Sequence, residues 1–480
     1  MRASARSGSG AASATCDLMI TNGYVVTLDA ERRIHKEGAI AIGGNAILAV
    51  GPQADMARHW RPRRVLDARG GTVHPGFIDA HNHIVHTTCR GLLDNRWEPS
   101  PAVSFADWKA DVRSEDEYVA TQFACLELLR NGFTMFIEPG TAFDNDAVAT
   151  AVEAVGMRAL LADCYLWDQV EIMRHLGSLE SRSLYERAAP TLERCMKQLG
   201  GELHRNKDPG ALVRGYVSVY GLGTASDELL KAAKDLADES GVIFQQHEGY
   251  VPAASRADRE RLGRSRIAHL AELGLLGDNS CLIHMNVMED GDITLIANSG
   301  TSVIWCSAAY LQLGIAAEAP CRLPELRERG GHVALGLDGA LNCAIGDAAH
   351  CAYLVAASVG RPITPGAVLE METIEAARAA RLADRIGSLE AGRRADIVIR
   401  RTDLPEVFPA VNPVHQLALT ARAGTVDTVI VDGRIVMKNG HSTLVDEEHV
   451  LHEVQDSVRR RMARLEVAPT RYWSTPGDGS

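Results

Sequence analysis

The spacing of apolar and polar positions divides the chain into segments of different kinds. Between Asp17 and Val73, short apolar runs alternate with turns that contain Gly and Asn, a pattern typical of a β-meander. After Pro75, apolar runs of about four to six residues alternate with longer stretches of helical spacing, such as Glu115 to Asn131. We therefore expect a small β unit followed by repeated strand–helix units.

Eight strand–helix units can be counted from Phe77 onward. The predicted strands each consist of an apolar run that ends at or beside a polar or aromatic residue; after the run at Phe77 they are 133–138, 159–163, 213–220, 241–247, 280–284, 301–305 and 332–338. Eight such units over about 300 residues match a (β/α)₈ TIM barrel in number and size. The chain is therefore predicted to be an α/β protein built around this barrel.

The end of the chain returns to predicted strands. Segments 387–399 and 426–440 contain short apolar runs with Asp-Gly and Asn-Gly turns, so β segments flank the barrel on both sides. We expect both chain termini to form one small β-sandwich domain, because each part can cover the apolar face of the other. Residues 447–465 combine helical spacing with many charges and predict a surface helix.

The predicted organisation has five parts. They are a disordered leader at 1–15, the first part of the small β domain at 16–74, the barrel at 75–385, the second part of the β domain at 386–445, and a C-terminal helix and tail at 446–480. The leader lacks the apolar stretch of a secretory signal. No window approaches the run of about 18 apolar residues that a membrane helix needs.

The composition is that of a globular enzyme. Of the 480 residues, 46% are apolar and 23% are charged, and the net charge of −12 argues against binding to a nucleic-acid backbone. Ten cysteines occur without a Cys-x-x-Cys pair, which favours reduced thiols over a disulfide framework. We therefore expect a cytoplasmic homo-oligomer that acts on a small molecule and binds neither nucleic acid nor membrane.

Two histidines, His81 and His83, follow the first predicted barrel strand. Side chains at i and i+2 of a strand point the same way, so these imidazoles can form half of a metal site. In a (β/α)₈ barrel, catalytic residues lie at the C-terminal ends of the strands. The candidate residues at the other strand ends are Glu138, Tyr220, His247, His284 and Asp338.

These motifs resemble the amidohydrolase superfamily, in particular its branch of adenosine-type, cytosine and guanine deaminases and triazine hydrolases. The resemblance covers nearly the whole chain, and it rests on segment 75–83, Arg90-Gly91, His247, His284, segment 336–339 and segment 387–396. It implies that one divalent metal ion is held by His81, His83, His247 and Asp338. It also implies that His284 lies beside the attacking water.

The chemistry of these side chains agrees with that assignment. Three neutral imidazoles and one carboxylate leave a divalent ion positively charged, which lowers the pKa of a bound water from about 15.7 towards about 7. Asp338 can take the proton from the water, while His284 polarises the group under attack. No lysine stands at a predicted strand end, so one ion is favoured over a dinuclear site. Zinc is the first choice, with iron, cobalt and manganese as alternatives.

The fifth predicted strand departs from the resembled pattern. Deaminases of this branch carry His-x-x-Glu there, and the glutamate moves a proton onto a ring nitrogen. This chain has His247-Glu248-Gly249-Tyr250 instead. Glu248 is predicted either as a catalytic acid in the pocket or as a residue that orients a metal ligand. Tyr250 is a poor proton shuttle at neutral pH, but it can donate a hydrogen bond.

Other residues are predicted to line the substrate pocket. Tyr220 and Trp305 stand where relatives often carry imidazoles, so the pocket should be more apolar and better suited to stacking. His86 lies where relatives contact the substrate, with a plain surface histidine as the alternative. Together with Glu138 and Tyr250, these are the predicted substrate-binding residues.

The sequence therefore predicts a metal-dependent amidohydrolase that cleaves a C–N bond of a small, partly apolar nitrogen compound. An amide, urea or carbamate-like carbonyl is the first expectation, because an acyl carbon needs no ring protonation. One alternative is an aminohydrolase or dehalogenase of a purine, pterin, pyrimidine or triazine. The other is a catalytically silent barrel that acts as a binding protein.

Overall fold

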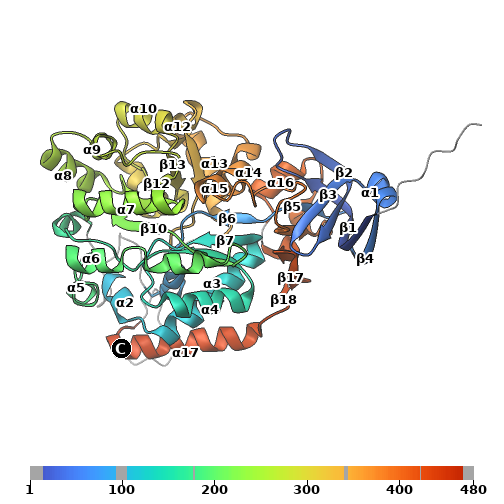
Figure 1. Ribbon diagram of the computed structural model, residues 1–480, viewed down its shortest axis with the longest axis horizontal. Helices are drawn as coiled ribbons and strands as arrows, with labels where there is room; N and C mark the ends of the chain where they lie inside the picture. The colour runs from blue at the N-terminus through green and yellow to red at the C-terminus, as the bar shows by residue number, and fades with distance from the viewer. Residues whose placement is uncertain (1–13, 93–104, 177–178, 340–343, 422, 469–480) are drawn as a thin grey trace, which may run out of the picture.

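A computed structural model describes residues 14–92, 105–176, 179–339, 344–421 and 423–468. Nearly all of the predicted leader at 1–15 lies outside these residues. Figure 1 shows a helix-covered barrel on one side of the molecule and a sheet built from both ends of the chain on the other.

The barrel has eight strand positions, in the segments that the sequence predicts. They are β6 (Phe77–Asp79), β7 (Phe133–Ile137), β8 (Arg158–Leu161), β9 with β10 (Val213–Gly215 and Val217–Gly221), β11 (Phe244–Glu248), β12 (Ser280–His284), β13 (Ser302–Trp305) and β14 (His332–Leu335). β9 and β10 are two halves of one strand position, interrupted at Tyr216; β9 pairs with β8 and β10 pairs with β11. Neighbouring strands in this series are parallel.

Backbone hydrogen bonds close the barrel between its first and last strands. Ala80 N donates to Leu335 O at 3.1 Å, and Asp338 N donates to His81 O at 2.9 Å. These bonds lie just beyond the C-terminal ends of β6 and β14. The closure of the barrel therefore brings His81 and Asp338 together through the backbone itself.

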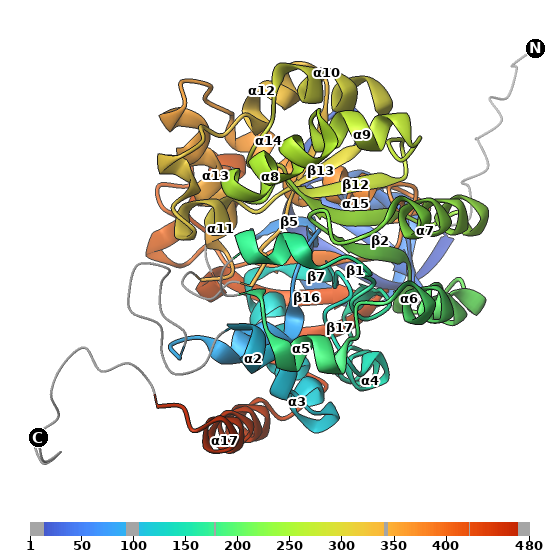
Figure 2. The ribbon, with the colours of Figure 1, turned by 90° about the vertical axis from the view of Figure 1, so that its left-hand side faces the viewer.

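Helices surround the barrel, as Figure 2 shows from a second direction, and one helix, α1 (Gln53–His59), packs instead on the sheet built from both ends of the chain. The helices are α1 (Gln53–His59), α2 (Phe105–Asp111), α3 (Ser114–Asn131), α4 (Asn145–Val155), α5 (Arg182–Arg187), α6 (Leu192–Gln198), α7 (Asp227–Ser240), α8 (Pro252–Leu262), α9 (Arg266–Glu272), α10 (Asp290–Ser299), α11 (Ser307–Gln312), α12 (Leu323–Glu328), α13 (Asp347–Ser358), α14 (Pro365–Glu372), α15 (Ile374–Ala379), α16 (Pro413–Leu419) and α17 (Glu447–Leu465). Short 3₁₀ helices are η1 (Ile84–Cys89), η2 (Glu171–His175), η4 (Gly201–Lys207), η5 (Ile315–Ala317), η6 (Pro405–Val407) and η7 (Ala423–Thr425).

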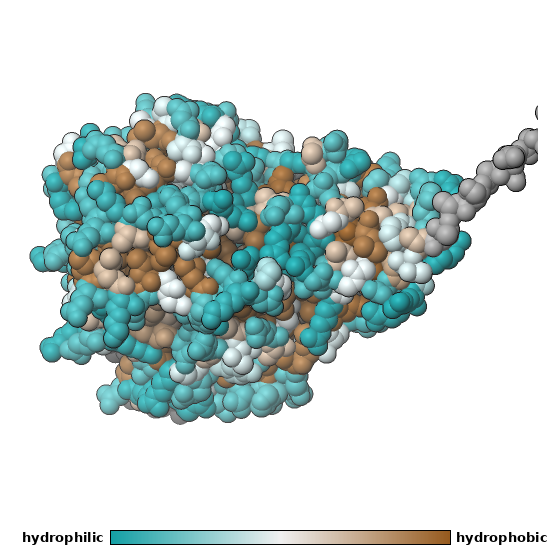
Figure 3. Space-filling view, viewed as in Figure 1, coloured by the Kyte–Doolittle hydropathy of each residue, from teal (hydrophilic) through white to brown (hydrophobic). Residues whose placement is uncertain are grey.

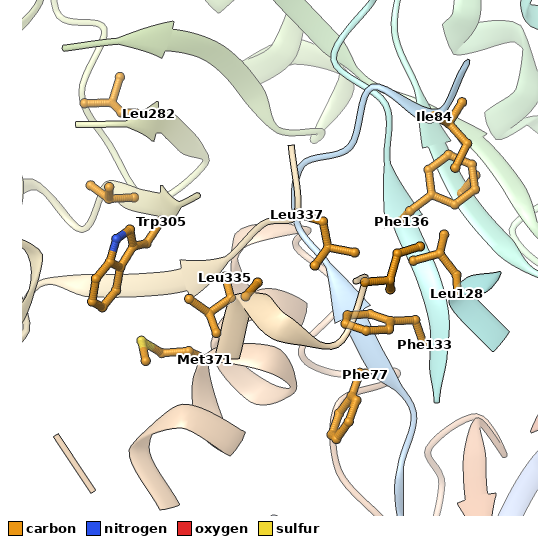
Figure 4. Close-up of a cluster of buried hydrophobic side chains, with 14 of the residues drawn as sticks. Phe77, Ile84, Leu128, Phe133, Phe136, Leu282, Trp305, Leu335, Leu337 and Met371 are labelled. Carbon is orange, nitrogen blue, oxygen red and sulfur yellow. The ribbon is translucent and has the colours of Figure 1, made fainter. Parts of the chain in front are cut away.

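Alternation along the barrel strands sorts their side chains into two layers. On β13, Ile304 packs in the inner layer with Ile78 and Ile283. Its neighbour Trp305 packs in the outer layer, between the strands and the helices, together with Met371 of α14. Figure 4 shows part of this outer layer.

The two ends of the chain meet in one sheet. Its strands are β1 (Ala14–Val26), β2 (Ile34–Gly43), β3 (Ala46–Pro52), β4 (Trp60–Asp67), β5 (Thr72–Pro75), β15 (Ile397–Arg400), β16 (Val426–Val431), β17 (Arg434–Lys438) and β18 (His441–Ser442). The antiparallel pair β5–β15 joins the N-terminal strands to the C-terminal strands. The hydrogen bonds form a single nine-stranded sheet, so the predicted sandwich of two sheets is not confirmed.

Helix α17 holds α2 and η1 in place. Arg461 of α17 donates to the backbone oxygen of Trp108 and, at 3.2 Å, to the hydroxyl of Thr88. Its guanidinium also lies 3.9 Å from the centre of a Trp108 ring. Arg464 forms ion pairs with Asp111 at 2.8 Å and with Asp116 at 3.0 Å. The predicted surface helix therefore has a buried inner face that positions two segments near the barrel.

Hydrophilic residues cover much of the face shown in Figure 3, and apolar residues appear between them in separate patches. Within the described ranges, no helix has both the length and the apolar composition needed to cross a membrane.

Candidate metal centre

Three histidines converge at the C-terminal end of the barrel. His81 and His83 follow β6, and His247 lies in β11. All three are buried, and one ring nitrogen of each lies within 4.8 Å of the others. The Asp338 carboxylate lies 3.7 Å from Nε2 of His81 and 3.4 Å from Nε2 of His83. The four residues predicted as metal ligands are therefore assembled in one place.

The chemical state of these histidines suits a metal ion. Burial lowers the pKa of His81 and His247 to about 3, so both rings are neutral at neutral pH. Neither ring nitrogen of His81 has a hydrogen-bond partner among the described residues, although both are buried. Buried polar atoms in native proteins usually have partners, and a bound cation supplies one. The donor set thus fits a divalent ion such as zinc.

Hydrogen bonds fix the orientation of two of the rings. Thr141 donates its hydroxyl proton to the Glu138 carboxylate at 2.5 Å, so the bond of 2.8 Å between Thr141 and His83 is donated by Nδ1 of His83. Nδ1 of His247 donates to the backbone oxygen of Tyr220 at 2.7 Å. In both rings the lone pair is consequently left on Nε2. Such outer hydrogen bonds set the tautomer of metal-binding histidines.

His284 and Asp338 have an unusual backbone. Their φ angles are 76° and 59°, in the left-handed region that residues other than glycine rarely adopt. His284 ends β12, and its ring centre lies 5.5 Å from that of His247. Strained backbone of this kind often occurs at functional residues, because the surrounding fold must hold it. Here the left-handed turn occurs at two of the residues predicted to be catalytic.

Several predicted substrate-binding residues lie against the metal centre. The ring of His86 stacks on His83 with centres 4.8 Å apart. Tyr220 lies 5.2 Å from His247, and Tyr250 lies 4.7 Å from His284. All three side chains therefore contact rings of the centre, and their role in substrate binding stays a prediction.

Glu248 does not face the metal centre, which corrects its prediction as a pocket acid. Strand β11 extends to Glu248, so alternation places its side chain opposite to that of His247. The carboxylate pairs with Arg266 of α9 at 3.3 Å, behind the strand. Burial raises the pKa of Glu248 to about 7. It also forms no hydrogen bond to His247, whose Nδ1 is bonded to Tyr220.

Trp305 and Glu138 also differ from their predicted role in substrate binding. Trp305 packs in the outer layer between strands and helices, because the inner position of β13 is taken by Ile304. The Glu138 carboxylate accepts hydrogen bonds from the backbone of Gly140 and Thr141 and from the Thr141 hydroxyl. Glu138 thus supports the orientation of a histidine instead of facing a substrate.

The structure adds residues that sequence reasoning missed. Cys306 has its sulfur within 4.8 Å of ligand atoms of His284 and Asp338. Its position directly after β13 is a strand end, and this signal was available in the sequence. Lys109 of α2 also lies near the centre, but it is on no strand end, so no pattern indicates it.

An aromatic cluster extends from the metal centre. Tyr220 lies 5.7 Å from Tyr165 and 5.0 Å from Trp167, and Trp167 lies 5.7 Å from Tyr185. Among the described residues, the buried hydroxyl oxygens of Tyr165 and Tyr185 have no hydrogen-bond partner. Tyr165 and Trp167 follow β8, so their place beyond a strand end also gave a sequence signal. The cluster provides flat apolar surfaces beside His247.

Known proteins resemble the chain over nearly its whole length. A family model described as "Amidohydrolase family" matches residues 72–436. A 5-methylthioadenosine/S-adenosylhomocysteine deaminase of Syntrophobacter fumaroxidans is 32% identical, over 92% of this chain and 98% of that protein. A 5'-deoxyadenosine deaminase of Methanosarcina mazei is 28% identical, over 94% of this chain and 99% of that protein.

Solved structures show the same fold. An adenosine deaminase from Xanthomonas campestris with bound zinc has a TM-score of 0.83 and 24% identity, and the match covers 94% of this chain and 100% of that one. An atrazine chlorohydrolase from Arthrobacter aurescens TC1 complexed with zinc has a TM-score of 0.77 and 21% identity, and the match covers 92% and 100% of the two chains. At these identities the likeness shows the fold alone.

Proposed function

The chain belongs to the amidohydrolase family of metal-dependent hydrolases, and we propose that it hydrolyses a C–N bond at the carbonyl carbon of a small, partly apolar amide, urea or carbamate. The reaction adds hydroxyl from water to the carbonyl carbon and a proton to the departing nitrogen. The products are an acid and an amine.

The proposed metal ligands are His81, His83, His247 and Asp338. A divalent ion bound there supplies a Lewis acid that makes water nucleophilic at neutral pH. His83 and His247 present Nε2 to it, because their Nδ1 atoms are bonded to Thr141 and to the Tyr220 backbone. The three histidines are buried, whereas the Asp338 side chain is 15% exposed, so the charges act in a site that is partly shielded from bulk water.

Asp338 and His284 are proposed to move the protons. The Asp338 carboxylate can accept a proton from the attacking water and pass it to the departing nitrogen. Burial lowers the pKa of His284 well below its ordinary value, so this ring is neutral and donates a hydrogen bond to the carbonyl oxygen as negative charge develops there. The left-handed backbone at both residues holds these groups at the strand ends.

The position of Glu248 is the observation that favours a carbonyl substrate over an aromatic ring. Deamination of an aromatic ring requires a proton on a ring nitrogen, and the nearest carboxylate in the chain after His247 points away to Arg266. Tyr250 lies near His284, but a phenol is a poor proton shuttle at neutral pH. An acyl carbon needs no such proton.

Deamination of an adenosine-like compound is the second candidate. Its support is the similarity to proteins named as deaminases of 5-methylthioadenosine, S-adenosylhomocysteine and 5'-deoxyadenosine, over more than nine tenths of this chain. The aromatic cluster around Tyr220 would suit a purine as well as an aryl group. In this case a group other than Glu248 would supply the ring proton.

The test is product release by the zinc-loaded protein. One panel contains N-aryl and N-alkyl amides, ureas and carbamates, with the released amine measured. The other contains adenosine, 5'-deoxyadenosine and 5-methylthioadenosine, with ammonium measured. Amine release alone supports the carbonyl substrate, and ammonium release from the nucleosides establishes the second candidate in its place.

Asp338→Asn is the control for both panels. It keeps the shape of the side chain but removes the proton acceptor, so turnover should fall about 10²-fold or more. If Asp338→Asn and the wild-type protein show equal turnover, the activity comes from a contaminating enzyme. A zinc-loaded protein that is silent on both panels would favour the binding-protein alternative. The cytoplasmic location, the homo-oligomer and the domain boundaries at 16–74, 75–385 and 386–445 stay predictions.

A further inference from the structure

Lys109 is a buried basic residue near the metal centre, and the proposed reaction gives it no role. It lies on α2, and only 5% of the residue is exposed. Its ammonium lies 4.3 Å from the centre of the Phe105 ring, which packs edge-on against His86 at 5.1 Å. His86 in turn stacks on His83. This series of contacts connects the ammonium, through Phe105 and His86, to His83 of the metal centre.

The positive charge of Lys109 lowers the pKa of histidines at the centre. Burial is the largest cause of the low pKa of His81 and His86, and the next cause for both is the positive charge of Lys109. The carboxylate of Asp338 acts in return to raise the pKa of Lys109. Burial nevertheless lowers the pKa of Lys109 to about 8, so most molecules carry the ammonium at neutral pH.

Lys109 has no counter-ion of its own. Within the described ranges it forms neither a hydrogen bond nor an ion pair. The acids of α2 are used elsewhere: Asp107 accepts from the hydroxyl of Ser181, and Asp111 pairs with Arg464. An unpaired buried charge is costly.

The neighbouring His86 is in the same condition. Both of its ring nitrogens are buried, and neither has a partner among the described residues. An ammonium and an imidazole thus lie on two sides of Phe105, near the metal centre, without hydrogen-bond partners among the described residues. A ligand that accepts hydrogen bonds would satisfy both.

We propose that Lys109, with His86 beside it, binds an anionic oxygen of the substrate, such as a carboxylate carried on its apolar part. This inference rests on the proposed function and narrows its substrate class to anionic amides, ureas or carbamates. Charge-assisted hydrogen bonds are stronger than neutral ones, and burial strengthens them further. The aromatic cluster would hold the apolar part of the same molecule.

Benzoate serves as the anionic probe and benzamide as the neutral probe of similar shape. Their affinities are measured by calorimetric titration of the full chain, both zinc-free and zinc-loaded. We expect benzoate to bind the wild-type protein in both states and more tightly than benzamide. Lys109→Met should weaken benzoate binding about tenfold or more and leave benzamide binding nearly unchanged.

The matched control is Lys234→Met. Lys234 is a buried lysine on α7 that is paired with Asp238 at 2.6 Å, and its removal should not change benzoate binding. Equal benzoate affinity in wild type and Lys109→Met overturns the inference. Benzoate binding that requires zinc and survives in Lys109→Met also overturns it, because the ion would then hold the carboxylate.

Thermal unfolding without ligand separates binding from a structural role. Removal of an unpaired buried charge should leave the Tm of Lys109→Met unchanged or higher. Benzoate should raise the Tm of the wild-type protein but not of the variant. Lys109→Arg keeps the positive charge and should retain benzoate binding. A lower Tm in Lys109→Met, together with an equal loss of affinity for benzoate and benzamide, would show a packing role and overturn the inference. Absence of turnover while benzoate binding still depends on Lys109 would instead refute only the proposed function.

Discussion

His83 donates from Nδ1 to the hydroxyl of Thr141 over 2.8 Å, and Thr141 links this ring to the buried carboxylate of Glu138. Glu138 accepts the Thr141 proton at 2.5 Å. The pair therefore fixes both the rotation and the tautomer of a ligand ring. The same chain of bonds explains why a buried glutamate stands at the end of β7.

Thr141→Val should weaken zinc binding. The valine has nearly the shape of threonine but cannot accept the His83 proton, so the ring loses its fixed tautomer. We expect zinc affinity to fall about 10- to 100-fold, measured by competition with a chromophoric chelator. Thr134→Val, a buried threonine at the other end of β7, is the control and should bind zinc normally. Unchanged affinity in Thr141→Val would contradict the role of the bond.

Glu248→Gln should retain activity. Its carboxylate faces Arg266 instead of the metal centre, so loss of the charge should change kcat/KM by no more than about threefold on the true substrate. We expect the free energy of unfolding to decrease in this variant, because Arg266 loses a buried ionic partner. A loss of about 10²-fold or more with an unchanged fold would show that Glu248 does serve as an acid.

Both outcomes of the Glu248 experiment concern a side chain that the sequence could not place. The side chain that follows His247 can point into the pocket if the strand ends at His247, and it points away if the strand continues. The outcome depends on whether residue 248 still pairs with the neighbouring strand. The structure extends β11 to Glu248. Trp305 presents the same problem in β13, where the inner position is taken by Ile304.

The barrel strands and the proposed metal ligands could be predicted from the sequence. Apolar runs bounded by turns located the eight barrel strands, and histidines or carboxylates at their ends gave the four proposed metal ligands, which the structure brings together. Lys109 could not be found in this way, because helix α2 reaches the centre only through tertiary packing. The form of the terminal sheet was also beyond the sequence, since the pairing of β5 with β15 joins residues more than 300 positions apart.

Tyr220→Ala should raise KM for aryl-bearing substrates. The ring packs on Tyr165, Trp167 and His247, and aromatic contacts contribute about 0.5–1.5 kcal/mol beyond area burial. We expect KM to rise about tenfold for an aryl substrate and less for a short alkyl analogue. Tyr220→Phe keeps the ring and serves as the matched variant. Equal KM effects on both substrates would argue against stacking.

Glu117 should make folding stability depend on pH. Burial raises its pKa to about 7, whereas an unfolded glutamate has a pKa of about 4.3. Between these values the folded state holds a proton that the unfolded state has released, so the contribution of this group to stability falls as pH rises. Glu117→Gln should flatten the dependence between pH 5 and about 7 in urea unfolding of the protein. A slope identical to wild type would contradict the shifted pKa.

Helix α17 packs on the segments that carry His86 and Lys109, although seven of the eight barrel strand positions lie between them in sequence. During synthesis on the ribosome, residues 84–111 emerge long before residues 447–465. The barrel strands can pair as they appear, but α2 lacks its Arg461 contact until the late helix is made. The pocket is therefore completed among the last steps of folding, and a nascent chain that stalls before this helix would carry an assembled barrel without a finished site.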